Sequence, residues 1–223
     1  MQDISNKPES YRVVIEGRQG EIEEKKSRFI CSVKAVETEA EATAFIEETK
    51  KKYWDARHNC SAFVIGENQE LTRCSDDGEP AGTAGRPMLE VLLGKGIHNA
   101  AVVVTRYFGG VLLGTGGLVR AYQASVQAGL DACKLMERKK GKLLTITTDY
   151  NGVGKLQYLF GKEHIPVIEA EYAAAVTMKV MIPLEQTAQI ETDITEMTSA
   201  TAGLEWGDPV TYGMNGEELE IFS

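Results

Sequence analysis

The sequence predicts an α+β protein of two domains, and three observations lead to this prediction. The chain has 223 residues, more than the common domain length of about 100–150 residues. Residues 1–141 carry 20 Lys and Arg against 20 Asp and Glu, whereas residues 142–223 carry 4 against 13. The whole net charge of −9 therefore falls in the second part, which confines any polyanion-binding surface to the first. Strand-like and helix-like periodicities alternate along both parts.

The first part is expected to open with a mobile polar tail over residues 1–10 and then a β-hairpin. The hairpin strands are YRVVIEG and EIEEKKSRFICSVKAV, with the turn placed in GRQG at residues 17–20. A helix follows, because Thr38 and Glu41 have the spacing of a capping box. The expected buried face of this helix consists of Ala42, Phe45, Ile46, Thr49 and Tyr53.

A second hairpin is predicted from HNCSAFVIG and QELTRC, followed by SDDGEPAGTAGRP, which has no apolar period. Loops of that length are usually functional or disordered. MLEVLLG reads as a short helix closed by Gly94. The apolar run AAVVVT predicts a buried central strand that leads into the glycine-rich stretch VTRYFGGVLLGTGGLVR. The helix after it is expected to bury Leu118, Tyr122, Val126 and Leu130.

The second part has the element order βαββαβ. After ERKKGK, interpreted as a linker, come strand LLTITTDY, a helix near VGKLQYLFGKE, strands IPVIEAEY and AVTMKVMIP, helix LEQTAQIETDITEM and strand GLEWG. This order is that of the ferredoxin-like split βαβ. The expected domains are residues 11–138 and 142–208, with a C-terminal extension over 209–223.

Three unusual segments are expected to meet at one edge of the first domain. In a hairpin, the end of the second strand lies beside the start of the first, which brings the acidic loop near Arg57, His58 and Asn59. A crossover helix would make AAVVVT parallel to QELTRC, so that both strands end at the same edge. Ligands commonly bind at such an edge in open α/β sheets. The candidate ligand-binding residues there are Arg57, His58, Asn59, Asp76, Asp77, Glu79, Arg86, Arg106, Tyr107, Gly109, Gly110, Gly114, Thr115, Gly116, Gly117 and Arg120.

The glycines fit no specific nucleotide motif. A Walker A loop needs GK[ST], yet Gly114 is followed by Thr115, and Val119 stands where a dinucleotide fingerprint needs its third glycine. DDGE lacks the alternating oxygen ligands of an EF-hand. Two interpretations stay open, a general anion site at a helix start and close helix packing.

The polar residues of this edge also allow two interpretations each. His58 and Cys60 point to one face of a strand and could form a thiolate–imidazolium pair, although a buried structural cysteine is the alternative. Asp76, Asp77 and Glu79 could hold Mg²⁺ or could bind backbone N–H groups in a turn. Arg106 beside Tyr107 suits phosphate contact with base stacking, but aromatic residues after a buried strand usually pack.

Membrane and zinc classes are disfavoured by the sequence. No segment has the roughly 20 apolar residues of a membrane helix, and MQDISNKPES does not resemble a signal peptide. The four cysteines, Cys31, Cys60, Cys74 and Cys133, form no CxxC pair. We therefore expect a cytoplasmic protein with free thiols and no membrane contact.

DARHNCSAFVIG, SDDGEPAGTAGRPML and VVVTRYFGGVLLGTGGLVRAY together resemble the Impact family in its bacterial two-domain form. The resemblance covers about residues 10–135. It implies a two-layer α/β N-terminal domain resembling domain 2 of ribosomal protein S5, and a ferredoxin-like C-terminal domain resembling domain V of elongation factor G. The eukaryotic member is a translational regulator with an extra N-terminal domain, and the family supplies no established catalytic residues.

We accordingly expect a non-enzymatic regulator that binds RNA, the ribosome or a translation-related protein through the glycine-rich cleft. No cofactor is expected. The alternative is an enzyme or binding protein for a small phosphorylated or acidic ligand, with His58, Cys60 or Asp77 as its reactive groups and Mg²⁺ as a conceivable cofactor. The sequence does not specify the oligomeric state.

Overall fold

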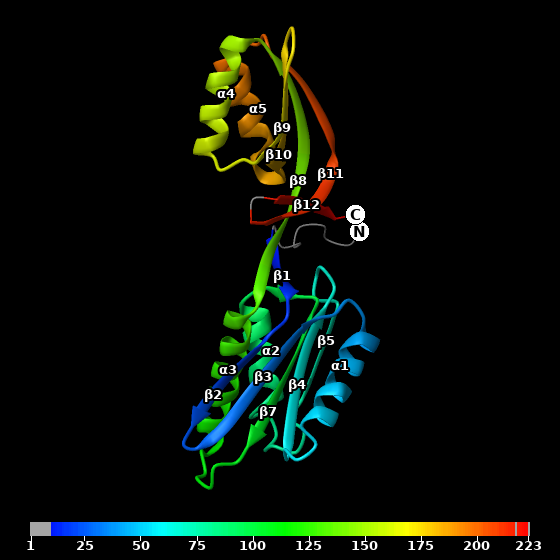
Figure 1. The fold of residues 1–223 in the computed structure, drawn as a ribbon, viewed down its shortest axis with the longest axis vertical. Helices are drawn as coiled ribbons and strands as arrows, with labels where there is room; N and C mark the ends of the chain where they lie inside the picture. Colours follow the sequence, from blue (N-terminus) through cyan, green and yellow to red (C-terminus); the bar gives the residue numbers. More distant parts are fainter. Residues whose placement is uncertain (1–9, 217, 223) are drawn as a thin grey trace, which may run out of the picture. The chain divides into compact units, whose positions relative to one another are not determined.

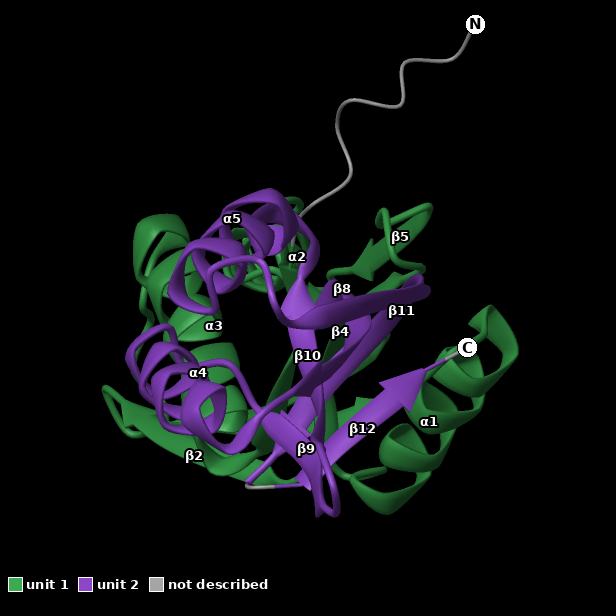
Figure 2. Cartoon of the chain, turned by 90° about the horizontal axis from the view of Figure 1, so that it is seen from above, with its two compact units in different colours: residues 1–137 green, residues 138–223 purple. Residues whose placement is uncertain are grey.

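The computed structural model describes residues 10–216 and 218–222 (Figure 1). The expected tail over residues 1–10 lies outside the described residues except for Ser10. The chain divides into two compact units, residues 1–137 (unit 1) and 138–223 (unit 2), coloured in Figure 2. Both combine helices with antiparallel sheet, so the predicted α+β class is confirmed. Within the described residues, no helix is long and apolar enough to cross a membrane.

Unit 1 is organised around a five-stranded sheet with the order β2-β3-β7-β4-β5. Each neighbouring pair is antiparallel. The central strand β7 is buried along all but its last residue, as its continuous apolar run predicts. The strands are β2 (Gln19–Glu24), β3 (Ser27–Ala35), β4 (His58–Ile65), β5 (Leu71–Ser75) and β7 (Ala100–Tyr107).

Helices cover both faces of this sheet. Helix α1 (Glu39–Lys52) lies on one face, and α2 (Gly85–Gly94) and α3 (Thr115–Ala132) lie on the other (Figure 1). The capping of α1 is confirmed, because Thr38 Oγ1 accepts from the Glu41 backbone N–H at 3.2 Å. The predicted buried faces are also observed, with Phe45 in the α1 core and Tyr122 in the core under α3.

The predicted hairpin around residues 17–20 is wrong. Strand β1 (Ser10–Glu16) instead pairs in parallel with β6 (Ile97–His98), and the hairpin is formed by β2 and β3. Its turn is at Lys25 and Lys26, which have φ values of 47° and 66°. The glycines of GRQG allow close packing instead of a turn. A Cβ at Gly17 would overlap the backbone of β3, and one at Gly20 would overlap the backbone of α3.

The predicted common edge is present in unit 1. Strands β5 and β7 are both antiparallel to β4, so they run in the same direction with β4 between them. The end of β7 therefore lies beside the start of β4, with Arg106 opposite His58.

Unit 2 has the predicted βαββαβ order. Its sheet order is β11-β8-β10-β9, and all neighbouring pairs are antiparallel. The buried core lies between this sheet and its two helices. The elements are β8 (Lys134–Thr148), α4 (Tyr150–Lys162), β9 (Val167–Tyr172), β10 (Val176–Pro183), a 3₁₀ turn (Leu184–Gln186), α5 (Thr187–Met197) and β11 (Gly203–Asn215).

Two segments of unit 2 differ from the sequence-based description. ERKKGK was interpreted as a linker, but it is part of strand β8. Residues after GLEWG continue β11 to Asn215, and β12 (Glu218–Phe222) pairs with that extension. The alternation of β8 is hidden because Lys and Arg occupy most of the segment, and polar residues give no apolar period to read.

Candidate functional site

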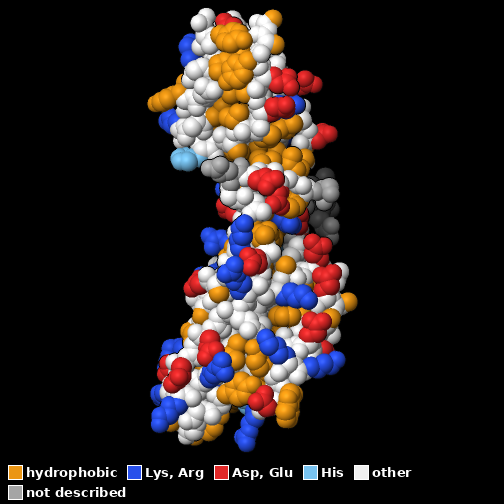
Figure 3. Space-filling view, in the orientation of Figure 1, with side chains coloured by type: hydrophobic (Ala, Val, Ile, Leu, Met, Phe, Trp, Pro, Cys, Tyr) orange, Lys and Arg blue, Asp and Glu red, His pale blue; other side chains and the backbone are white. Residues whose placement is uncertain are grey.

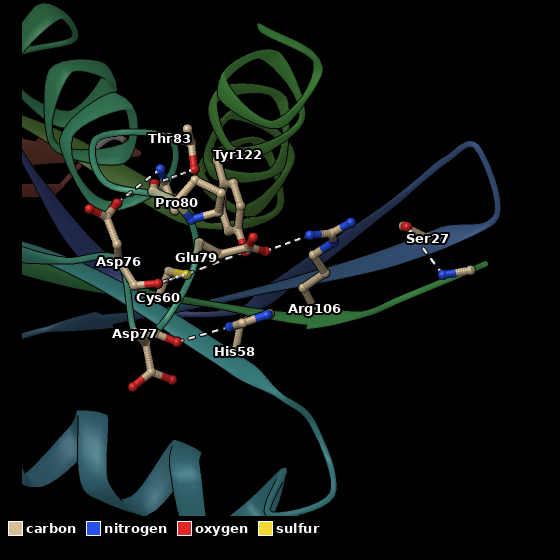
Figure 4. A network of polar contacts seen from close by, with 12 residues as sticks. Ser27, His58, Cys60, Asp76, Asp77, Glu79, Pro80, Thr83, Arg106 and Tyr122 are labelled. Atoms are coloured by element: carbon tan, nitrogen blue, oxygen red, sulfur yellow. Dashed lines mark hydrogen bonds and ion pairs between the residues drawn. The ribbon is translucent and has the colours of Figure 1, made fainter. Parts of the chain in front are cut away.

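The candidate site lies where β7 ends, at one edge of the unit 1 sheet. Three segments meet there, as the sequence predicts: the start of β4, the loop after β5 and the glycine-rich loop after β7 (Figure 4). The turn after α1 reaches the same edge, since Tyr107 donates a hydrogen bond to Asp55 at 2.8 Å. The convergence is thus a property of the fold and does not require a ligand.

Arg106 lies inside the unit and does not project from it. Its Nη1 donates to Glu79 Oε1 at 2.6 Å, and the two side chains are 8% and 3% exposed. The Tyr122 hydroxyl donates to the same oxygen at 2.9 Å, which ties α3 to the acidic loop. The guanidinium also lies over the rings of Phe29 and Phe108, 5.5 and 5.7 Å from their centroids. The fold therefore holds the guanidinium through one ion pair and two aromatic rings.

Asp76 organises the start of α2. Its carboxylate accepts from the backbone N–H groups of Gly82, Ala84 and Gly85 at 2.8, 3.1 and 2.8 Å. Burial raises the pKa of Asp76, but these hydrogen bonds stabilise the charged form and the net pKa is lowered. The turn interpretation of Asp76 is therefore the one that the geometry supports.

Asp77 connects three segments. Its Oδ2 accepts from the backbone N–H of Asn59 at 2.7 Å, and its Oδ1 pairs with Lys50 Nζ at 3.0 Å. Its carbonyl lies 2.9 Å from His58 Nδ1. Asn59 in turn accepts from Thr105 Oγ1 at 2.6 Å. These acidic side chains serve as internal acceptors, and within the described part of the chain no three His, Cys, Asp or Glu residues are grouped to hold a metal ion.

Cys60 is a structural thiol. It is fully buried, and its Sγ lies 3.0 Å from the Asp76 carbonyl and 3.3 Å from the Tyr122 hydroxyl. Burial is the main reason that its pKa is raised to about 12, so the thiol is protonated at neutral pH. The His58–Cys60 pair considered from the sequence is not formed, because the Nδ1 of His58 contacts the Asp77 carbonyl.

The glycines of the loop have two different roles. A Cβ at Gly109 would overlap Lys26 and Ser27, and the Gly109 N–H donates to Ser27 Oγ at 3.2 Å, so this glycine permits close packing on the β2–β3 turn. Gly110 and Gly114 have φ values of 83° and 72°, in the left-handed region. Gly116 is open, with only Arg120 Nη1 at 3.6 Å from a Cβ built there. Helix α3 starts at Thr115 without a side-chain cap.

Exposed side chains surround these buried contacts. Four basic residues at this end, Lys25, Lys26, Arg57 and Arg120, are exposed and form no ion pair within the described residues. Four apolar side chains are exposed beside them, namely Trp54 (83%), Phe108 (51%), Val111 (42%) and Leu112 (83%). We call these eight residues, with Gly109–Gly117, the glycine-rich edge. In Figure 3 both kinds of side chain are seen over the lower end of unit 1, mixed with acidic ones.

Some of these residues could not be found from the sequence. Lys25, Lys26 and Trp54 join the edge only because the hairpin turn and the end of α1 lie there. Arg86 was a candidate, but it is exposed on α2 and pairs with Glu90 at 3.0 Å. Nothing in the sequence around Lys25 and Lys26, or around Trp54, distinguishes a binding site from an ordinary solvent-exposed surface.

Each of the two parts of the chain matches a known protein family. The Impact N-terminal domain matches residues 25–130, and a domain of unknown function, DUF1949, matches residues 146–201. The chain is 42% identical over 203 residues to the IMPACT family member YvyE of Bacillus subtilis, covering 91% of this chain and 93% of that protein. It is 36% identical over 182 residues to the IMPACT family member YigZ of Escherichia coli, covering 81% and 89%.

A eukaryotic relative and a solved structure extend the comparison. Protein IMPACT of Danio rerio is 36% identical over 98 residues, which cover 42% of this chain and 30% of that protein. A crystal structure of "an hypothetical protein" is 34% identical with a TM-score of 0.55, and the match covers 88% of this chain and 97% of the other. The likeness to the eukaryotic protein is thus limited to one part of each chain.

Proposed function

The chain belongs to the Impact family, and from this premise we propose that it is a non-enzymatic, translation-associated protein that binds RNA or the ribosome through the glycine-rich edge of unit 1. The cytoplasmic location expected from the sequence is part of this proposal. The second unit, in which 7 Lys and Arg stand against 13 Asp and Glu, carries most of the negative charge of the chain and takes no part in the RNA contact.

The observation that carries the proposal is the combination of unpaired basic side chains with exposed rings. Lys25, Lys26, Arg57 and Arg120 can each neutralise a backbone phosphate. Trp54 and Phe108 present faces on which an unpaired base can stack. Glu23 and Glu24 lie on the same hairpin, so the basic residues are spaced among acidic ones.

Protein binding by the same edge is the second candidate function. It is favoured by Leu112, which is 83% exposed although it is purely aliphatic. Val111, directly before it, is 42% exposed as well, and contiguous exposed apolar side chains mark protein-interaction surfaces. A small phosphorylated ligand remains the enzyme-like alternative, and the uncapped start of α3 is the feature that supports it.

Co-sedimentation with ribosomes and with RNA at two salt concentrations tests the proposal. The edge variant changes Lys25, Lys26, Arg57 and Arg120 to Gln. The control variant changes Arg12, Lys34, Arg73 and Lys95 to Gln, which alters the charge equally at positions away from the end of β7. We expect salt-sensitive binding by the wild type and the control variant only. Absence of binding by the wild type at low salt would reject the RNA proposal and favour a protein or small-molecule ligand.

A further inference from the structure

Arg106 has a hydrogen-bond donor that the fold does not use. Its Nη1 is bound to Glu79, but its Nε is buried and has no acceptor within the described residues. The side chain is only 8% exposed, so bulk water does not replace the missing acceptor. A buried donor without a partner costs roughly 1–3 kcal/mol, which makes such atoms rare in folded proteins. A donor of this kind needs an acceptor from outside the chain, which is either an ordered water or an oxygen of a ligand.

The Arg106 side chain lies on the side of the sheet that α3 covers. Arg106 and Tyr122 meet at the same Glu79 oxygen, and Figure 4 shows both side chains on that side of β7. Tyr122, Leu118 and Thr115 follow each other at helical spacings of four and three residues, so they share one face of α3. Long side chains in a helix lean toward its N-terminus. Arg106 therefore lies on the side of the sheet that α3 covers, near the end of a Tyr122 side chain that leans toward the helix N-terminus.

The first turn of α3 supplies further donors. Its opening N–H groups have no intrahelical acceptor, and the N-cap residue Gly114 offers no side-chain oxygen. A Cβ built at Gly114 would meet nothing within 4 Å, and one at Gly116 would meet only the end of Arg120. Backbone donors in an open space of this kind can approach an oxoanion closely.

One of the two rings beside Arg106 lies at the surface. Phe29, on β3, is fully buried, whereas Phe108 is 51% exposed and begins the loop to α3. Gly110 and Gly114, both with positive φ, border the segment that follows Phe108. An outward movement of Phe108 would expose the guanidinium without disturbing its ion pair with Glu79.

We propose that Arg106 Nε and the first-turn N–H groups of α3 together form an oxoanion subsite for a phosphate group. The inference rests on the proposed function, since a phosphodiester of bound RNA is the expected source of that group. A free phosphate has the same chemistry, so the test includes both. Phe108 moves outward when the subsite is filled, and the phosphate oxygen accepts from Nε while Glu79 stays on Nη1.

Nuclear magnetic resonance on the full ¹⁵N-labelled chain tests the subsite. The Arg106 Nε–H signal, assigned by its loss in Arg106→Lys, and the Gly116 and Gly117 amide signals are followed during titration with inorganic phosphate and with a short oligoribonucleotide. Gly116→Asp places a carboxylate in the open space, so we expect it to weaken phosphate binding at least about tenfold by repulsion. Gly116→Ala adds only a methyl group there and serves as the matched control.

The outcomes distinguish a failure of the subsite proposal from a failure of the proposed RNA binding. Shifts of all three wild-type signals with both probes would support the subsite, provided that the shifts of Arg106 Nε–H and of the Gly117 amide are lost in Gly116→Asp and kept in Gly116→Ala. Oligoribonucleotide binding that leaves the Arg106 Nε–H signal unchanged would overturn it while the proposed function stands. Shifts with phosphate alone would support the subsite and reject RNA binding. No shift with either probe would overturn both.

Discussion

Arg106 and Glu79 form an ion pair of 2.6 Å that is closed off from solvent by the side chains around it. The two residues come from different segments, the end of β7 and the loop after β5, and they hold the candidate site together. The pair also changes how the site must be tested. Removing Arg106 would disturb the fold as well as any ligand contact, so the exposed residues of the edge are better probes of binding.

Breaking this pair on one side should destabilise unit 1 strongly. We expect Arg106→Ala or Glu79→Ala to lower the free energy of unfolding by about 3–5 kcal/mol, because each leaves an uncompensated buried charge. Urea unfolding of both single variants and of the double variant measures the coupling. The double variant should lose less free energy of unfolding than the two single variants lose together. Additive losses would show that the two side chains do not depend on each other.

The role of Asp76 predicts a pH dependence. Its folded-state pKa lies below the ordinary value of 3.8, so its contribution to stability is complete above 3.8 and is lost as the pH falls through the lower, folded-state pKa. Asp76→Ala, which deprives backbone donors of their acceptor, should cost about 1–2 kcal/mol near neutral pH. The difference from the wild type should shrink below pH 3.8. A difference that grew on acidification would contradict this account of Asp76.

Thiol reactivity distinguishes Cys60 from the exposed Cys74. Iodoacetamide at neutral pH should label Cys74 in the folded protein and leave Cys60 unmodified, because burial raises the pKa of the Cys60 thiol to about 12. Mass spectrometry of the labelled peptides makes the comparison. Labelling of Cys60 only after addition of denaturant is expected. Rapid labelling of Cys60 in the native state would revive the thiolate–imidazolium interpretation.

Alanine substitutions should show that Gly109 is tightly packed and that Gly116 is not. Gly109→Ala places a methyl group against the backbone of Lys26 and should cost about 1–3 kcal/mol, because neither backbone can move away freely. Gly116→Ala lies within α3 and meets only the flexible end of Arg120, so it should leave stability unchanged or raise it by up to about 1 kcal/mol. Thermal unfolding of the two variants gives the comparison. Equal destabilisation would mean that both glycines are packed.

The sequence predicted the parts of the fold that depend on local pattern. The βαββαβ order of unit 2, the capped start of α1 and the buried strand β7 all follow from periodicity and capping. The first hairpin was predicted wrongly. The segment GRQG has the composition of a turn, but its glycines are there because they allow close contact with β3 and α3. The actual turn uses two lysines with positive φ, which have no turn signature.

The candidate site was predicted in its location but not in its contacts. The shared edge follows from strand directions, so His58, Asp77 and Arg106 were expected to be neighbours. Which charges pair with one another depends on register and depth across three strands, and neither can be read from local sequence. Arg106 therefore looked like a surface residue from the sequence, although it is buried against Glu79.

The salt dependence of RNA binding tests the central claim most directly. Binding of a labelled single-stranded oligoribonucleotide is measured over a range of salt concentrations for the wild type, the edge variant and the control variant. If the four basic residues of the edge contact phosphates, the slope of log affinity against log salt should be smaller by about 3 in the edge variant, since each contact contributes about 0.7. The control variant should keep the wild-type slope. Equal slopes for all three proteins would contradict RNA binding at the glycine-rich edge.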